Sequence, residues 1–236
     1  MRVLTWNAFG GSTAALAAAL TANNIDLCVL QEAQVNPASP WYAPLAGLAG
    51  YVLTPSVREN VCHALPGGTL YPADSQVRAY AIVRRTATIP APPEVKLVDY
   101  TTDGVWGPKT PTDPFKAAQA GYNQRPPLRI KFPFGGFMTT LFTWHAPQVA
   151  IWNPLAVSMF DQSKALADAV AQRAVIAGDL NTKSVAGHFG AFAGVQQQDT
   201  KIDYVLANTT LANVSEIPGI NLQAGSHWAL AADVTW

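Results

Sequence analysis

Short apolar runs with the composition of β-strands recur along this 236-residue chain, and many of them stop or start at a polar phrase. The phrases are Thr5-Trp6-Asn7, Leu30-Gln31-Glu32, Ala177-Gly178-Asp179-Leu180-Asn181, Lys201-Ile202-Asp203-Tyr204 and Gly225-Ser226-His227-Trp228. Residues at strand ends can present side chains to a shared pocket while the strands themselves stay in the core. The pattern therefore predicts a sheet protein with a polar site assembled from distant segments.

The start of the chain predicts a strand, a helix and a second strand. These elements are expected from Arg2 to Trp6, from Ser12 or Thr13 to about Ala22, and from Ile25 to Leu30. A crossover of this length favours parallel strands. The polar residues that follow the two strands, Asn7 and Gln31-Glu32, are therefore expected at the same edge of a sheet.

The rest of the chain mixes hairpins with crossovers. Further strands are predicted near 51–54, 78–84, 128–132, 137–144, 174–177, 202–207 and 228–234, and a helix at 154–173. The proline-rich stretch from Ile89 to Pro127 is expected to be a surface excursion that borders the substrate groove. We predict an α/β fold of two packed mixed β-sheets flanked by helices, a four-layer α/β sandwich, in one catalytic domain over residues 1–236.

The composition argues against several classes of protein. Hydrophobic residues make up 49% of the chain, charged residues make up 13%, and the formal net charge is zero. These values disfavour intrinsic disorder and a high-affinity, sequence-specific DNA binder. No apolar run reaches the roughly 20 residues of a membrane span, and the first strand leaves no room for a signal peptide before it. We expect a soluble chain.

Two cysteines, Cys28 and Cys62, are too few for a disulfide scaffold in a chain of this length. Cys28 lies in a predicted strand and Cys62 in a region rich in glycine and proline. Whether the two pair stays open.

Hydrolysis of a phosphodiester requires a cation, an ordered water and charge stabilisation of the leaving oxygen. Mg²⁺ prefers carboxylate and amide oxygens, and Mn²⁺ or Ca²⁺ are the alternatives. Glu32, at a strand exit, and Asn7 beside it are the candidate metal ligands. The alternative interpretation is a solvated strand end at Glu32 and a turn residue at Asn7.

Asp179 and Asn181 are two residues apart, so on an extended strand exit their side chains point to the same side. An aspartate can hold or deprotonate the attacking water, and an asparagine amide can bind the scissile phosphate without adding repulsive charge. An ordinary β-turn is the alternative, because glycine, aspartate and asparagine are common turn residues.

Two histidines at strand ends are candidates for contacting a phosphate. His145 follows one predicted strand, and His227 precedes another. A histidine held by a carboxylate can stabilise the transition state, and Asp203 is the expected partner of His227. For His145 the sequence offers only a guess, Asp74. A purely structural histidine is the alternative in both cases.

Arginines supply candidate cations for the substrate. Arg78 and Arg125 are predicted to form forked contacts with phosphate oxygens, because a planar guanidinium can donate two parallel hydrogen bonds. Arg84 and Arg85, by contrast, are interpreted as solvated charges at the end of a strand.

The ordered motifs resemble the endonuclease/exonuclease/phosphatase superfamily, the fold of pancreatic-type deoxyribonuclease, and within it the catalytic B subunit of cytolethal distending toxins. The resemblance spans almost the whole chain and includes Val29-Leu30-Gln31-Glu32-Ala33, Thr143-Trp144-His145-Ala146, Gly178-Asp179-Leu180-Asn181 and Ile202-Asp203-Tyr204. The resemblance implies that Glu32 and Asn7 hold the metal and that Asp179 and Asn181 align the water and the phosphate. It also implies that His145, His227 and Arg125 contact the scissile group. Asp203 is implied to orient His227.

One residue departs from the pattern that the resemblance implies. Family members usually carry an aspartate before the final histidine, whereas this chain has Ser226. The leading hypothesis is a monomeric, Mg²⁺-dependent enzyme that nicks DNA with weak sequence selectivity. A role as a toxin effector and accessory subunits stay open, and the chain is expected to be secreted if it is a toxin and otherwise cytoplasmic. The alternatives are a phosphatase acting on phosphoinositides or other phosphomonoesters, and a weakly active or inactive binding homologue.

Overall fold

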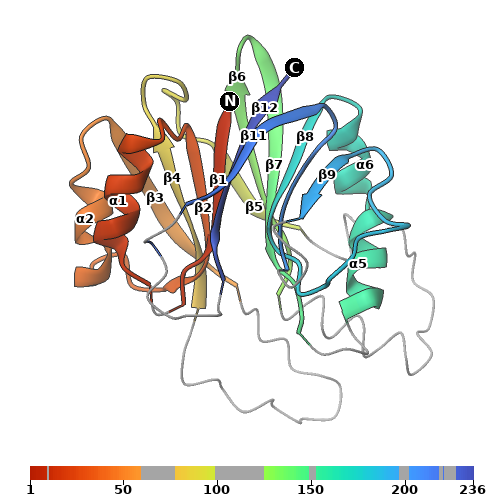
Figure 1. The fold of residues 1–236 in the computed structure, drawn as a ribbon, viewed down its shortest axis with the longest axis horizontal. Coiled ribbons are helices and arrows are strands. Elements are labelled where there is room, and N and C mark those ends of the chain that lie inside the picture. Colours follow the sequence, from red (N-terminus) through yellow and green to blue (C-terminus); the bar gives the residue numbers. More distant parts are fainter. Residues whose placement is uncertain are drawn as a thin grey trace.

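A computed structural model describes residues 1–9, 11–59, 78–98, 125–148, 153–196, 202–217, 220 and 227–236 (Figure 1). The first half contains β1 (Arg2–Asn7), α1 (Thr13–Ala22), β2 (Leu27–Gln34), η1 (Pro40–Tyr42), α2 (Ala43–Ala46), β3 (Tyr51–Arg58), β4 (Arg78–Arg85) and β5 (Glu94–Leu97). The second half contains β6 (Leu128–Phe134), β7 (Phe137–His145), α5 (Asn153–Asp161), α6 (Lys164–Val170), β8 (Arg173–Asp179), β9 (Ala193–Gln196), β10 (Asp203–Ala207), β11 (Thr210–Ile217) and β12 (Ala229–Thr235).

The strands form two six-stranded sheets that pack face to face. One has the order β11-β12-β1-β2-β4-β3, and the other has the order β5-β6-β7-β8-β10-β9. Each sheet contains one parallel pair, β1 with β2 and β7 with β8, among antiparallel neighbours. Helices α1 and α2 lie outside the first sheet, and α5 and α6 lie outside the second (Figure 1). The predicted four-layer α/β sandwich is confirmed.

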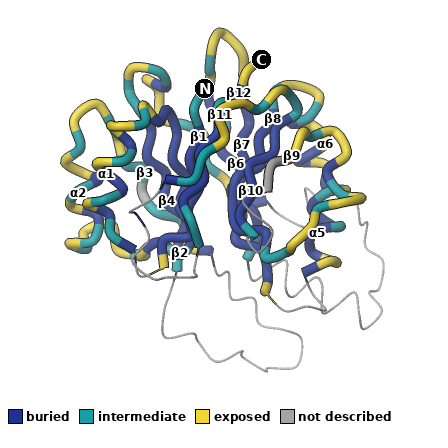
Figure 2. The backbone as a smooth tube through the Cα atoms, viewed as in Figure 1, coloured by how far each residue is buried: buried dark blue, intermediate teal, exposed yellow. Residues whose placement is uncertain are grey.

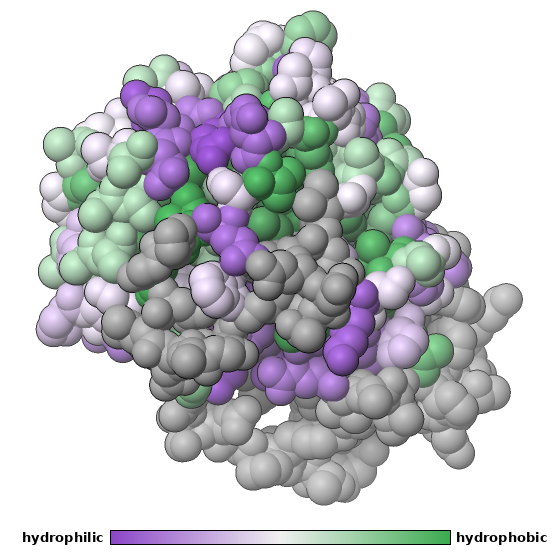
Figure 3. All heavy atoms as spheres, viewed as in Figure 1, coloured by the Kyte–Doolittle hydropathy of each residue, from purple (hydrophilic) through white to green (hydrophobic). Residues whose placement is uncertain are grey.

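Three buried apolar layers hold this arrangement together. Val29 and Leu141 belong to the layer between the sheets. Leu16 of α1 packs on the outer face of the first sheet, and Phe160 of α5 packs on the outer face of the second. Figure 2 shows the strands as the buried centre of the molecule, with exposed residues on the outer helices and connections. On the face in Figure 3, hydrophilic and hydrophobic residues are interspersed over the described elements.

The predicted strand–helix–strand unit forms as expected. Ser12 caps α1 by accepting a hydrogen bond from the backbone of Ala15. The parallel register of β1 and β2 places Asn7 opposite Gln31. A second crossover, through α5 and α6, joins the parallel strands β7 and β8. Polar residues that follow these strands therefore meet at one end of the sandwich.

Several elements differ from the sequence prediction. Strand β3 continues to Arg58 because Pro55 falls at a bulge of an edge strand, where proline is tolerated. The single helix predicted at 154–173 is two helices, since Ser163 caps a new one by accepting from Leu166. Strands β9 and β11 and the short helices η1 and α2 were not predicted, and neither was β5 within the proline-rich stretch, of which 99–124 lie outside the described residues.

Arg84 is also different from its interpretation as a solvated charge. Its side chain is buried and donates hydrogen bonds to the backbone carbonyls of Ile89 and Pro90. Because Arg84 follows Tyr80 and Ile82 on the face of β4 that meets the other sheet, the guanidinium points inward. It stabilises the connection after β4.

Candidate active site

Three candidate residues stand side by side in the second sheet. The parallel register of β7 and β8 places His145 opposite Asp179, and the antiparallel register of β8 and β10 places Asp203 opposite Asp179. All three are completely buried. Because residues opposite one another in a sheet share a face, their side chains form one polar row across three strands. These strand ends are separated by tens of residues, so the row exists only in the folded chain.

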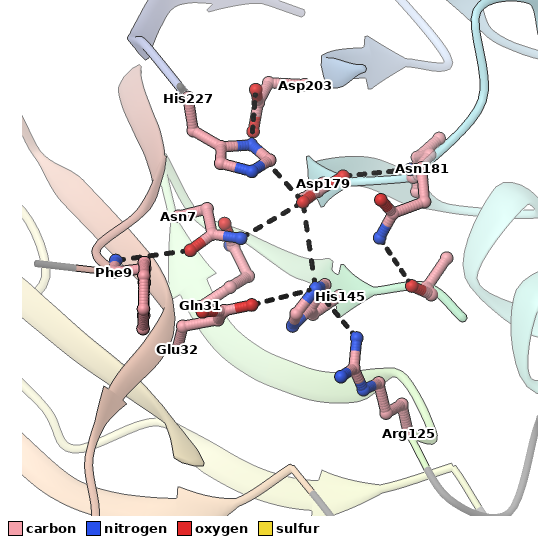
Figure 4. A network of polar contacts seen from close by, with 12 residues as sticks. Asn7, Phe9, Gln31, Glu32, Arg125, His145, Asp179, Asn181, Asp203 and His227 are labelled. Atoms are coloured by element: carbon pink, nitrogen blue, oxygen red, sulfur yellow. Dashed lines mark hydrogen bonds and ion pairs between the residues drawn. The ribbon is translucent and has the colours of Figure 1, made fainter. Parts of the chain in front are cut away.

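The first sheet supplies Asn7 and Glu32, which face this row (Figure 4). The Nδ2 atom of Asn7 donates a hydrogen bond of 3.1 Å to Oδ2 of Asp179. The Oε1 atom of Glu32 lies 3.3 Å from Nε2 of His145. Glu32 has a φ of 53° and sits where the register of β2 against β4 shifts. This bulge turns the carboxylate into the site.

Gln31 connects the two sheets beneath the site. Its Nε2 atom donates to Oγ1 of Thr5, at 3.0 Å, and to Oγ1 of Thr143 in the opposite sheet, at 2.7 Å. The Gln31 side chain is completely buried. Burial of an amide is favourable only when its hydrogen bonds are satisfied, so this contact fixes the spacing of β2 and β7 where their ends carry Glu32 and His145.

His227 approaches the row from the segment before β12. Its Nδ1 atom is 3.2 Å from Oδ2 of Asp203 and 3.3 Å from Oδ2 of Asp179. Burial is the largest influence on its pKa and lowers it, but the hydrogen bond to Asp203 and the charges of both aspartates raise the pKa of His227 to about 9. His227 is therefore an imidazolium at neutral pH, with Nδ1 anchored by the two carboxylates.

The acidic partner of His145 is Glu59, which the sequence prediction missed. The Nδ1 atom of His145 is 2.9 Å from Oε2 of Glu59, and both side chains are completely buried. Glu59 directly follows β3, in the same strand-end position as the other site residues. The sequence prediction missed Glu59 because it ended this strand near Thr54, before Pro55, whereas β3 continues to Arg58. The earlier guess, Asp74, lies outside the described residues.

The protonation of His145 follows from its neighbours. Arg125 can only donate, and its NH1 atom is 2.9 Å from Nε2 of His145, so Nε2 accepts and Nδ1–H donates to Glu59. Burial lowers the pKa of His145 to about 4, although the charge of Asp179 acts in the opposite direction. His145 is therefore neutral at pH 7. Burial also raises the pKa of Glu59 to about 8.

Asn181 lies in the site, but its backbone is not extended as predicted. Its φ of 50° places it in the left-handed region, where its N–H donates to Oδ1 of Asp179 at 2.9 Å. Asparagine tolerates this conformation because of such local hydrogen bonds. Its Nδ2 atom donates to the carbonyl of Ala146, at 2.6 Å, which ties together the segments that follow β8 and β7.

The two predicted phosphate-binding arginines both lie at the site. Arg125 contacts His145 as described, and its own carbonyl accepts from Nε1 of Trp144 at 2.6 Å. Arg78, at the start of β4, forms an ion pair with Glu32. Both guanidinium groups adjoin the polar row, and their contact with phosphate stays a prediction.

Asp179 and Asp203 are completely buried opposite one another on neighbouring strands. Burial, followed by the charge of Asp203, raises the pKa of Asp179 to about 6. A raised pKa for a carboxyl group beside another carboxylate indicates that a nearby cation would stabilise the ionised forms. A bound divalent cation would supply this charge.

Two sets of residues fit a divalent cation. Asp179, Asp203 and His227 offer ligand atoms within 4.8 Å of one another, so a group that could hold a metal ion is present among the described residues. In this group, however, a metal would have to replace the proton that His227 shares with the aspartates. Glu32 and Asn7 offer oxygen ligands alone, as Mg²⁺ prefers. The donor set thus fits a hard cation on the Glu32 side of the site.

The structure does not test the expectations for Ser226 and Cys62, because both lie outside the described residues. Cys28 is a buried thiol, and burial raises its pKa. Within the described ranges, no helix combines the length and apolarity needed to cross a bilayer.

Solved structures with low sequence identity share this fold. Humanized D. rerio TDP2 matches with a TM-score of 0.63 and 13% identity, over 98% of this chain and 97% of that one. The human Nocturnin catalytic domain with bound sulfate gives 0.63 and 13%, over 100% and 94%. A mannosyl-6-phosphatase of Bacteroides thetaiotaomicron gives 0.57 and 12%, over the full length of both chains. The architecture is therefore the DNase I-like fold.

The family follows from the sequence itself. A model of the Endonuclease/Exonuclease/phosphatase family matches residues 4–226, so the chain belongs to this family. Its members are hydrolases that act on phosphoesters. Among curated proteins, no sequence matches the chain.

Proposed function

We propose that this protein is a divalent-metal-dependent phosphodiesterase that nicks DNA with little sequence preference. The observation that carries the proposal is the register of three strands, which places His145, Asp179 and Asp203 in one buried row facing Asn7 and Glu32. This set contains groups for each requirement of phosphodiester hydrolysis. A D. rerio TDP2 structure of the same fold, complexed with a single-strand DNA product, supports DNA as the substrate class.

Each side chain has a distinct task in the proposed reaction. Glu32 and Asn7 would hold a cation, which supplies positive charge to the non-bridging oxygens of the phosphate. Asp179, oriented by Asn7 and by the backbone of Asn181, holds the attacking water and accepts its proton. The geometry leaves Oδ2 of Asp179 at the centre of the row.

His227 and Arg125 contact the phosphate directly, and His145 positions Arg125. His227 is held through Nδ1 by Asp203 and, as an imidazolium, would donate Nε2–H to a phosphate oxygen. His145 is held through Nδ1 by Glu59, which directs Nε2 toward the site. Arg125 donates to that nitrogen and is placed to donate to the phosphate when substrate binds.

Supercoiled plasmid provides the direct test. With Mg²⁺ or Mn²⁺ the protein is expected to convert it to the open circular form, and a chelator is expected to stop the reaction. Asp179→Asn and His227→Gln should each lower the rate at least roughly 100-fold. Asp168→Asn, on the exposed surface of α6, is the matched control and should behave as wild type. Absence of metal-dependent nicking at high protein concentration contradicts the proposal.

A phosphomonoesterase is the second candidate, supported by the shared fold of the mannosyl-6-phosphatase. The same cation and phosphate contacts serve either leaving group. Release of inorganic phosphate from mannose 6-phosphate or an inositol phosphate headgroup, without plasmid nicking, would favour this activity. Nicking without phosphate release favours the diesterase.

Ser226 decides between a full enzyme and a weakened one. A serine hydroxyl adds no negative charge beside His227, so we expect Ser226→Asp to tighten Mn²⁺ binding, measured by calorimetry, and to raise the nicking rate. Wild-type protein that binds neither Mg²⁺ nor Mn²⁺ would instead support a catalytically inactive binding homologue.

The proposed toxin role and the assembly are tested separately. The resemblance to the toxin subunit supports a genotoxin effector, which should cause chromosomal breaks when introduced into cultured mammalian cells, whereas Asp179→Asn should not.

We also propose a monomer with one catalytic domain over residues 1–236. Light scattering and a single cooperative unfolding transition are the expected results.

A further inference from the structure

The segment after β1 presents an aromatic ring beside the candidate active site. Phe9 is 44% exposed. Its backbone N–H donates to Oδ1 of Asn7 across 3.3 Å, so the ring adjoins a candidate metal ligand (Figure 4). A single exposed aromatic side chain is ordinary on a protein surface, but this one stands beside a polar site, where its large flat face can contact a ligand.

Hydrogen bonds of Ala8 and Gly11 hold the backbone near Phe9, and these bonds do not involve its ring. Ala8 donates to the carbonyl of Gln31 at 2.8 Å, and Gly11 donates to the carbonyl of Ala8 at 3.0 Å. The indole N–H of Trp41 donates to the carbonyl of Gly11 at 3.2 Å. The ring therefore projects from a segment that is tied to β2 through Gln31 and to Trp41, which lowers the entropic cost of binding a ligand there.

Arg78 links this ring to the carboxylate side of the site. Its guanidinium carbon lies 4.9 Å from the centre of the Phe9 ring, in a cation–π contact, and its NH1 atom pairs with Glu32. The guanidinium thus bridges the gap between the ring and the carboxylate. A substrate phosphate that contacts Arg78 would have a neighbouring nucleotide within reach of Phe9.

We propose that Phe9 is a base-stacking subsite, which receives the nucleobase next to the phosphate under attack while Arg78 contacts the connecting backbone. The inference rests on the proposed nuclease function and specifies its substrate contact. Every nucleobase has a flat π-face, so stacking on an aromatic ring adds affinity with little sequence preference. That property matches a neutral protein that lacks the charge for many phosphate contacts.

Phe137 provides a matched control in the same chain. It is also an exposed phenylalanine, at 60%, and the guanidinium carbon of Arg173 lies 4.0 Å from its ring centre. Phe137 begins β7, whereas His145 ends it. The two residues are therefore at opposite ends of a nine-residue strand, about 27 Å apart at the rise of a β-strand.

Binding of a fluorescent base tests the subsite without any need for hydrolysis. A short single-stranded oligonucleotide containing 2-aminopurine is titrated with protein in chelator, and stacking is read as quenching of its fluorescence. Wild type and Phe137→Ala should quench it. Phe9→Ala should abolish the quenching and weaken binding about 10-fold, whereas Phe9→Trp should preserve both. Equal quenching by wild type and Phe9→Ala overturns the proposal, as does an equal loss in Phe137→Ala.

Hydrolysis of dinucleotides gives the second measurement. Thymidylyl-thymidine is compared with analogues in which one base is replaced by an abasic tetrahydrofuran, on either side of the phosphate. Removal of the stacked base should lower kcat/KM of the wild type about 10-fold but leave that of Phe9→Ala unchanged, because its contact is already missing. If the abasic substitution lowers kcat/KM by the same factor in Phe9→Ala as in wild type, stacking on Phe9 is contradicted. Phe9-dependent quenching without any hydrolysis retains the subsite and refutes the proposed nuclease function alone.

Discussion

The Nδ1 atom of His145 lies 2.9 Å from Oε2 of Glu59, and the two residues are 86 positions apart. Glu59 follows β3 in the first sheet, while His145 ends β7 in the second. The contact therefore joins the sheets at the floor of the site. It also explains why His145 presents Nε2, and not Nδ1, to Arg125.

Replacement of Glu59 by glutamine should impair catalysis more than binding. The amide keeps the size of the side chain, but its NH2 group can take the place of the acceptor oxygen that fixes the tautomer of His145. We expect kcat for plasmid nicking to fall roughly 100-fold with little change in KM. Glu94→Gln, on β5 with a side chain 64% exposed, is the control and should leave kcat unchanged. An unaltered His145 tautomer in nitrogen NMR spectra of Glu59→Gln would contradict this explanation.

The metal-free protein should lose stability as the pH rises from about 6.5 to 9. The pKa of Glu59 is raised by burial to about 8, and that of His227 is raised to about 9, mainly by Asp203 and Asp179 against burial. The folded state therefore binds more protons than the unfolded state in this window, and its advantage fades as both groups deprotonate. Urea unfolding at several pH values measures the slope. Glu59→Gln should flatten it below about pH 8, and a slope of the opposite sign would refute the assignment.

Divalent metal should stabilise the fold by relieving repulsion among the buried carboxylates. A free metal concentration 100 times the Kd adds about 2.7 kcal/mol, or about 5 to 10 °C in Tm for a chain of this size. Glu32→Gln should abolish the shift, whereas Asp168→Asn should retain it because its side chain is 63% exposed on α6. Scanning calorimetry with Mg²⁺, Mn²⁺ and chelator makes the measurement. A full shift in Glu32→Gln places the metal elsewhere.

Gln31 should be a strong contributor to stability although it takes no part in the proposed chemistry. Gln31→Leu leaves the hydroxyl of Thr143 buried without its donor, which is expected to cost about 1 to 3 kcal/mol in the free energy of unfolding. In the double variant with Thr143→Val the losses should be less than additive, since both polar partners are gone. Urea denaturation of the three variants gives the coupling energy, and strict additivity would disprove the bridge.

Gly178 should be intolerant of any side chain. It pairs with Trp144 across β7 and β8, and a Cβ at this position would lie 2.2 Å from the carbonyl oxygen of Trp144. Gly178→Ala must push apart the two strands that carry His145 and Asp179, so we expect a loss of at least about 3 kcal/mol. Gly190→Ala, whose Cβ meets nothing within 4 Å, should change stability by less than about 0.5 kcal/mol. Similar unfolding midpoints for both variants would contradict the packing argument.

The sequence by itself determined the fold class and the residues named for the site. Apolar periodicity and the crossover length fixed β1, α1 and β2, because these depend on local composition and on the handedness of short connections. Polar residues at strand ends then marked Asn7, Glu32, His145 and Asp179. The bulge at Pro55 and the cap at Ser163 escaped prediction for a local reason, because proline can end a strand or sit at a bulge and serine occurs both inside helices and at their caps.

Tertiary structure alone decided which groups touch. The pairing of Glu59 with His145, the bridge from Gln31 to Thr143 and the ion pair of Arg78 with Glu32 each join strands that are remote in the chain. No periodicity encodes a contact across two sheets, since it depends on register, on bulges and on which buried polar groups must be satisfied together. The same burial sets the pKa values of His145 and Glu59, and with them the protonation of the site.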